Sequence, residues 1–221
     1  MIRVRLSDLE IARRDPGAYL RKLKEPKPKF GRKSKHAVLL LAVYRFHKYS
    51  GGLFDKFSGD LTGALKYFDA LYEKKKFKKD PASKKFYQER LTTYAKEFGE
   101  LDSEVVKYKD NLVLTLPEEF KDKIEVYGQV PRVDLSLEGY SVWLFDKSLK
   151  NWRDEIRFPI IQAAYAQKFS ADLEEVKVGV YDFSTASYTS YSFTEDEVTE
   201  AQTLLYGLLR QLITISSRTK N

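Results

Sequence analysis

The chain has 221 residues, of which 43% are hydrophobic and 32% charged, a composition that suits one globular domain and excludes a disordered chain. Its 39 basic and 32 acidic side chains give a net charge of +7, which is compatible with a polyanionic partner but is more often a matter of solubility alone. The absence of cysteine excludes disulfides, cysteine zinc sites and cysteine-ligated iron–sulfur clusters, and fits an intracellular, cytoplasmic protein. With no signal peptide and no apolar run of about 20 residues, we expect no membrane partner.

The first half of the chain is predicted to be mainly helical. A first helical pattern opens near Ser7, breaks at Asp15-Pro16-Gly17 and resumes to residue 23. Further helices are expected over residues 33–49, 61–72 and 82–98. A stiff basic linker at 25–29 and a lysine run at 74–79 lie between them. The lysine run is more typical of a solvated loop than of a phosphate-binding segment.

The second half is predicted to form a sheet. Strands are expected over residues 112–116, 124–127, 130–137, 140–145, 176–183 and 188–193, with helices over 160–169 and 195–213. The fold class is therefore α/β or α+β, a mixed sheet flanked by helices with a helical N-terminal half. We expect a single domain over 1–221, with a helical part at 1–110 and a sheet core at 111–221.

An acidic pair marks the candidate chemistry. Asp134 lies on an apolar strand, where a charge is costly unless it is paired, metal-bound or at the strand end. The next strand runs into Asp146 and Lys147, and a hairpin could bring the two aspartates together. A divalent cation would relieve their repulsion, and a nearby lysine could activate water for phosphodiester hydrolysis. The same residues can instead serve as ordinary turn and cap residues.

Four short segments, taken in order, resemble a known family. They are Gly31 to His36, Val-Pro-Arg-Val-Asp-Leu-Ser at 130–136, Val-Trp-Leu-Phe-Asp-Lys-Ser at 142–148, and Gln162 to Tyr165. Together they resemble the RecB-like branch of the PD-(D/E)XK nuclease superfamily, in the form that lacks a cysteine-ligated iron–sulfur cluster. Compact stand-alone members of this branch are frequent in viruses and mobile elements. The resemblance implies a restriction-endonuclease-like sheet and metal-dependent hydrolysis of DNA, single- or double-stranded.

The resemblance also implies roles for individual residues. Asp134, Asp146 and Lys147 would be catalytic, and His36, Asp134 and Asp146 would ligate Mg²⁺ or Mn²⁺. Glu125 would be an additional acid. His47, eleven residues after His36 and about three helical turns on, is expected on the same helix face.

Residues of the Gln–Tyr helix would contact the nucleic acid. Gln162 and Tyr165 would bind it or brace the site. Arg153 and Arg157, just before this helix, are placed to touch phosphates, or else form a surface ion-pair cluster.

The motif departs from the family at one point. The family has one residue between its second acid and its lysine, whereas Asp146 and Lys147 are adjacent and should face opposite sides of a strand. Lys150 or Lys168 could replace Lys147. The alternatives are a catalytically inactive nuclease-fold protein that binds nucleic acid or acts in assembly, with a homo-oligomer open, and an unrelated α+β interaction protein.

Overall fold

The computed structural model describes residues 1–25, 34–47, 59–74, 80–100, 103–146 and 151–218. Within these ranges a six-stranded mixed sheet is flanked by seven α-helices. The predicted class, α and β elements with a mixed sheet between helices, is confirmed. None of the helices in the described ranges has the length and apolar character needed to cross a membrane.

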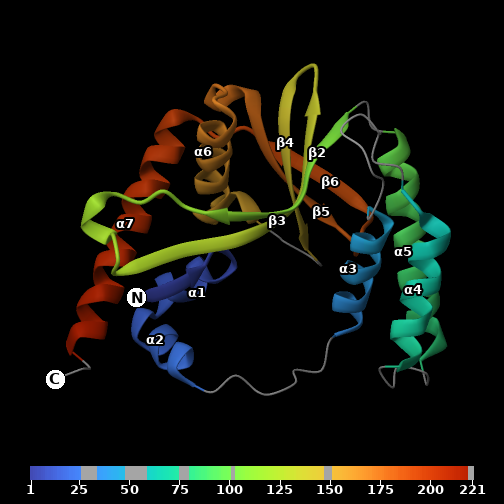
Figure 1. Cartoon of the computed structure of the whole chain (residues 1–221), viewed down its shortest axis with the longest axis horizontal. Helices are drawn as coiled ribbons and strands as arrows, with labels where there is room; N and C mark the ends of the chain where they lie inside the picture. The colour runs from blue at the N-terminus through green and yellow to red at the C-terminus, as the bar shows by residue number, and fades with distance from the viewer. Residues whose placement is uncertain (26–33, 48–58, 75–79, 101–102, 147–150, 219–221) are drawn as a thin grey trace.

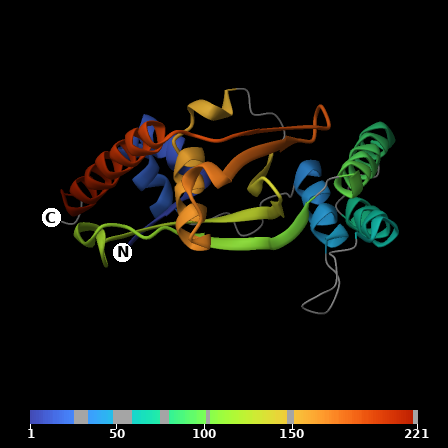
Figure 2. The same ribbon diagram turned by 90° about the horizontal axis from the view of Figure 1, so that it is seen from above.

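The helices gather at opposite ends of the molecule (Figures 1 and 2). One end consists of α3 (Lys35–Phe46), α4 (Leu61–Lys74) and α5 (Pro81–Glu100). The other end, where both termini lie, consists of α1 (Leu9–Arg14), α2 (Pro16–Lys24) and α7 (Glu195–Arg218). The remaining helix, α6 (Arg157–Phe169), lies between these two ends.

The sheet is organised around one long central strand. Its order is β1-β3-β4-β5-β6. β2 lies off this path and also pairs with β3. β2, β3 and β4 form an antiparallel meander, α6 crosses over, and β5 returns parallel to β4. The strands are β1 (Ile2–Arg5), β2 (Glu104–Val113), β3 (Ile124–Ser136), β4 (Gly139–Asp146), β5 (Val176–Asp182) and β6 (Ser187–Tyr191).

The expected order of strands and helices in the second half is confirmed, and the strands of the whole sheet differ from the expectation in three respects. The strands predicted at 124–127 and 130–137 are one continuous strand, β3. Neither β1 nor the first eight residues of β2 was predicted. β1 alternates apolar and charged residues but is only four residues long, and in β2 a register shift after Val105 and the polar run Lys109-Asp110-Asn111 interrupt the alternation. β2 also runs across the division expected at residue 110. The linker at 25–29 lies outside the described residues apart from Glu25, and the lysine run lies outside them after Lys74.

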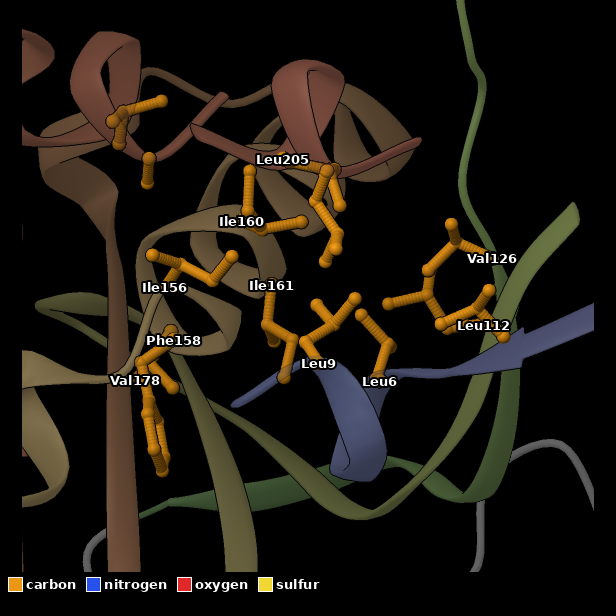
Figure 3. Close-up of a cluster of buried hydrophobic side chains, with 14 of the residues drawn as sticks. Leu6, Leu9, Leu112, Val126, Ile156, Phe158, Ile160, Ile161, Val178 and Leu205 are labelled. Atoms are coloured by element: carbon orange, nitrogen blue, oxygen red, sulfur yellow. The ribbon is translucent and has the colours of Figure 1, made fainter. Parts of the chain in front are cut away.

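Two hydrophobic clusters hold the fold together. The larger lies between the sheet and α1, α6 and α7, as Figure 3 shows for Leu9, Ile161 and Leu205. The smaller joins α3, α4 and α5 to the sheet through Tyr181 and Phe183. Because side chains alternate along a strand, β4 serves both clusters: Val142 belongs to the larger, and Phe145 packs against the smaller. The side chains considered below lie where the smaller cluster meets the sheet.

Gly179 of β5 makes room for a tryptophan beside that junction. It pairs with Trp143, and an added Cβ would lie 2.5 Å from the indole Cζ3 and 2.6 Å from the carbonyl oxygen of Thr189. We expect Gly179→Ala to lower the free energy of unfolding by about 1–2 kcal/mol, because the backbone carbonyl cannot move away. Urea unfolding measures this. Gly207→Ala in α7 is the matched control, since its Cβ would meet nothing within 4 Å. Equal stability of the two variants would refute this tight packing.

Candidate functional site

The aspartate predicted to bind metal is held in a buried ion pair. Arg132 and Asp134 lie two residues apart on β3 and so face the same side of the sheet. Their side chains are only 4% and 2% exposed. Arg132 Nε donates to Asp134 Oδ1 at 2.6 Å, and Arg132 Nη2 donates to Oδ2. The guanidinium therefore binds both carboxylate oxygens in the fork geometry that makes such pairs strong.

Trp143 completes the surroundings of this carboxylate from the neighbouring strand. It is the register partner of Arg132 in the β3–β4 hairpin, and its Nε1 donates to Asp134 Oδ2 at 3.0 Å. Burial raises the pKa of the Asp134 carboxyl, while hydrogen bonds from Arg132, Trp143 and Ser103 oppose that rise by favouring the charged form. All the nearby donors thus stabilise Asp134 as an anion inside the protein.

The ion pair extends into a buried polar network beneath the helices. Arg132 Nη1 donates to Tyr94 Oη at 3.3 Å, and Tyr94 Oη lies 2.6 Å from His47 Nε2. The Phe98 ring packs against the guanidinium at 4.3 Å. Burial, aided by the charge of Arg132, lowers the pKa of His47 to about 3, so the imidazole is neutral. The network joins α3 and α5 to the sheet through hydrogen bonds as well as apolar contacts.

The space beside this network is small. A cavity of about 20 Å³ lies between α5 and the sheet. A volume of that size holds roughly one water molecule. Its walls include Arg132, Trp143 and Phe98. A nucleotide has no room here in the described arrangement.

The hairpin does not bring Asp134 and Asp146 together, contrary to the sequence-based expectation. Asp134 pairs with Ser141 close to the turn, whereas Asp146 ends β4, five residues further along. At about 3.4 Å per residue, the backbones of these two positions are roughly 17 Å apart. One metal ion bound by both carboxylates is therefore incompatible with this register. Lys147 and Lys150 lie outside the described residues.

Asp146 instead lies beside a different acid. It is the register partner of Asp182, at the carboxyl ends of the parallel strands β4 and β5. Asp182 Oδ1 accepts from the backbone N of Ser184 at 2.7 Å and from its hydroxyl at 2.6 Å. His36, in the first turn of α3, contacts the ring of Phe183 with centroids 6.1 Å apart. Three chain segments bearing His or Asp thus meet at this edge of the sheet.

The described side chains do not form a metal-binding cluster. Among them, no group of three His, Asp or Glu residues is close enough to hold an ion. The oxygens of Asp134 are already bound by a cation and an indole, so this carboxylate does not fit a resident Mg²⁺ or Mn²⁺.

The two residues of the Gln–Tyr motif are buried in the protein interior. Gln162 is fully buried and holds the backbone of Phe193 from both sides, accepting from its N at 2.7 Å and donating to its O at 3.0 Å. Tyr165, also fully buried, donates to Asp110 Oδ2 at 2.6 Å. Lys168 binds the same oxygen of Asp110 at 2.5 Å. Gln162 and Tyr165 brace α6 on the sheet and are not exposed to a ligand.

The remaining predicted residues are scattered. Arg157 is buried and pairs with Glu155 at 2.6 Å, while exposed Arg153 lies over the Tyr191 ring at 4.5 Å. Glu125 binds Arg3 at 2.7 Å and precedes Asp134 by nine residues on the same strand, so it belongs to another region.

The partners of Asp134 in the buried network were not among the residues predicted from the sequence. Arg132 could have been found, because Arg-x-Asp on an apolar strand puts opposite charges on one face. Tyr94, His47 and Trp143 join only through tertiary packing, which no local pattern predicts.

Comparisons with known proteins leave the family open. No family model matches the chain, and no curated protein does. Among solved structures the chain is similar to "Crystal structure of SSO0001", with 12% identity over 91% of this chain and 85% of that one and a TM-score of 0.33.

Proposed function

We propose that this chain is a nucleic-acid-binding protein with a nuclease-like fold that does not cleave phosphodiesters through Asp134. The observation that carries this proposal is the occupation of both Asp134 oxygens by Arg132 and Trp143.

A metal ion at Asp134 would have to compete with the arginine. A divalent cation needs carboxylate lone pairs that here accept hydrogen bonds, and it would lie beside a fixed positive charge. Arg132 cannot relieve the repulsion of a metal cation by losing its proton, because a guanidinium stays charged in proteins. A buried arginine–aspartate pair therefore favours a structural role for this position.

Two features support nucleic acid as the partner. The net charge of +7 is compatible with a polyanion. The meander of β2, β3 and β4, the crossover α6 and the parallel strand β5 also follow the element order implied by the nuclease resemblance. DNA therefore remains the expected partner, without catalysis at Asp134.

Binding is tested by fluorescence anisotropy of labelled single- and double-stranded DNA across a salt series. We expect measurable affinity whose logarithm falls linearly with the logarithm of salt concentration, because bound phosphates release counterions. Absence of binding at low salt would refute the proposal.

A second candidate function is metal-dependent DNA cleavage centred on Asp146. It is favoured by the pairing of Asp146 with Asp182 and by the nearby contact of His36 with Phe183. A cation bound there would stabilise the folded state by mass action. If this candidate holds, Mn²⁺ raises the melting temperature of the wild type but not of Asp146→Ala. A wild type unaffected by Mn²⁺ excludes it.

A further inference from the structure

A basic groove lies at the end of the molecule that carries both termini. It has a volume of about 610 Å³ and is formed by β1, α2, Tyr127 of β3 and Ser216 of α7. This volume is within the range of about 300–1,000 Å³ typical of ligand sites. Four cations and two carboxylates line it: Arg3, Arg5, Lys22, Lys24, Asp8 and Glu25. The groove therefore carries an excess of positive charge.

One tyrosine orders the arginines of the groove. Arg3 lies over the Tyr127 ring at 4.5 Å and is anchored by Glu125 at 2.7 Å. Arg5 Nε donates to Tyr127 Oη at 3.2 Å, which restrains this guanidinium. The parallel pairing of β1 with β3 fixes this arrangement, since Arg3 is opposite Glu125 and Arg5 is opposite Tyr127. The positive charge on β1 is thus held in place before a ligand arrives.

Three of the cations are available to an anion. Among the described residues, no carboxylate lies within ion-pair distance of Arg5, Lys22 or Lys24. All three side chains belong to exposed residues. Lys22 and Lys24 of α2 line the groove together with the arginines of β1, so two elements supply its positive charge. A polyanion lying along it could contact both.

The groove also offers apolar and aromatic surface. Leu23 of α2, which is 40% exposed, lines it together with the partly buried Ile2 and Tyr127, while Tyr19 and Leu20 form its floor and are only 3% and 7% exposed. Phosphates bind to cations, whereas unpaired bases bind to apolar and aromatic side chains. In a duplex the bases are stacked inside and cannot reach such walls. The combination matches a single strand.

We propose that this groove binds single-stranded nucleic acid, with Arg5, Lys22 and Lys24 on the phosphates and the apolar walls on the bases. This inference rests on the proposed function and assigns its site. The groove is remote from the Arg132–Asp134 pair, because Tyr127 precedes Asp134 by seven residues on β3. Changes in the groove should therefore leave the buried network intact.

The test compares two double variants with the same change in net charge. Lys22→Glu/Lys24→Glu alters the groove, whereas Lys66→Glu/Lys107→Glu alters exposed lysines on α4 and β2. Binding of labelled oligo-dT and oligo-U is measured across a salt series, with duplex DNA and inorganic polyphosphate as further arms. Urea unfolding verifies that both variants are folded.

We expect the groove variant to lose at least tenfold in affinity for the single strands. Its salt slope should flatten by about 1.4, as expected for two lost phosphate contacts on a single strand. The control variant should keep the wild-type slope. Duplex DNA and polyphosphate should bind more weakly than the single strands.

Each contrary result has a separate meaning. Equal losses in the two variants would overturn the groove assignment while leaving the proposed function standing, provided that the wild type binds. Equal binding of polyphosphate or duplex would overturn the single-strand assignment. A wild type that binds no nucleic acid would refute the proposed function itself.

Discussion

Replacing Arg132 with methionine is expected to lower the free energy of unfolding by about 3–5 kcal/mol. The substitution leaves the Asp134 carboxylate buried, with 2% of its side chain exposed and without its counter-charge. The Trp143 Nε1 hydrogen bond would remain but cannot offset the cost of an isolated buried anion. Urea unfolding near neutral pH measures the loss.

The matched control removes both charges. We expect Arg132→Met/Asp134→Leu to be more stable than Arg132→Met, because no uncompensated ion is left. The Trp143 indole would then lack its acceptor, so part of the loss, about 1–3 kcal/mol, should persist. Additive costs of the two substitutions would contradict a direct partnership and would free Asp134 for another role.

The second large effect is a loss of stability in acid that depends on His47. Its pKa in the folded protein is about 3, against an ordinary value of 6.5. Between these values the unfolded chain binds a proton that the folded chain does not, so stability falls as pH is lowered from 6.5 toward 3. At about 1.4 kcal/mol per pH unit, this should cost roughly 2.5 kcal/mol at pH 4.5.

His47→Phe isolates this contribution. Phenylalanine keeps a ring among Phe46, Tyr94 and Phe98 but cannot be protonated. The variant loses the Tyr94 contact at every pH, so the informative quantity is the change in unfolding free energy between pH 7.5 and 4.5. We expect this change to be smaller than in the wild type by roughly 2.5 kcal/mol. Equal changes would show that His47 does not titrate as its burial implies.

Much of the second half of the fold could be predicted from local patterns. β3, β4 and β5 have apolar runs that end at turn residues. α7 begins with a capping box of the Thr-x-x-Glu type, in which Thr194 N donates to Glu197 Oε2 at 2.8 Å and Glu197 N donates to Thr194 Oγ1 at 3.3 Å. β1 was not predicted because an alternation of four residues is a short signal, and most of β2 was not predicted because a register shift and a polar run interrupt its alternation.

The candidate site was less predictable because it depends on register. Sequence alone identified Asp134 as a charge that needs a partner, and that reasoning is confirmed by Arg132. It could not say which end of the hairpin each aspartate occupies. The turn at Gly139 sets that register, with Ser136 opposite Gly139 and Asp134 opposite Ser141. The same turn leaves Asp146 beside Asp182, a neighbour from a distant segment.

The most direct measurement follows a labelled single-stranded DNA in a large excess of protein with Mn²⁺. Anisotropy shows that the strand is bound, and a denaturing gel of the same sample shows whether it is cut. We predict that the wild type binds the strand and leaves it intact. Cleavage by the wild type that Asp146→Ala abolishes would contradict this account and establish the metal-dependent nuclease.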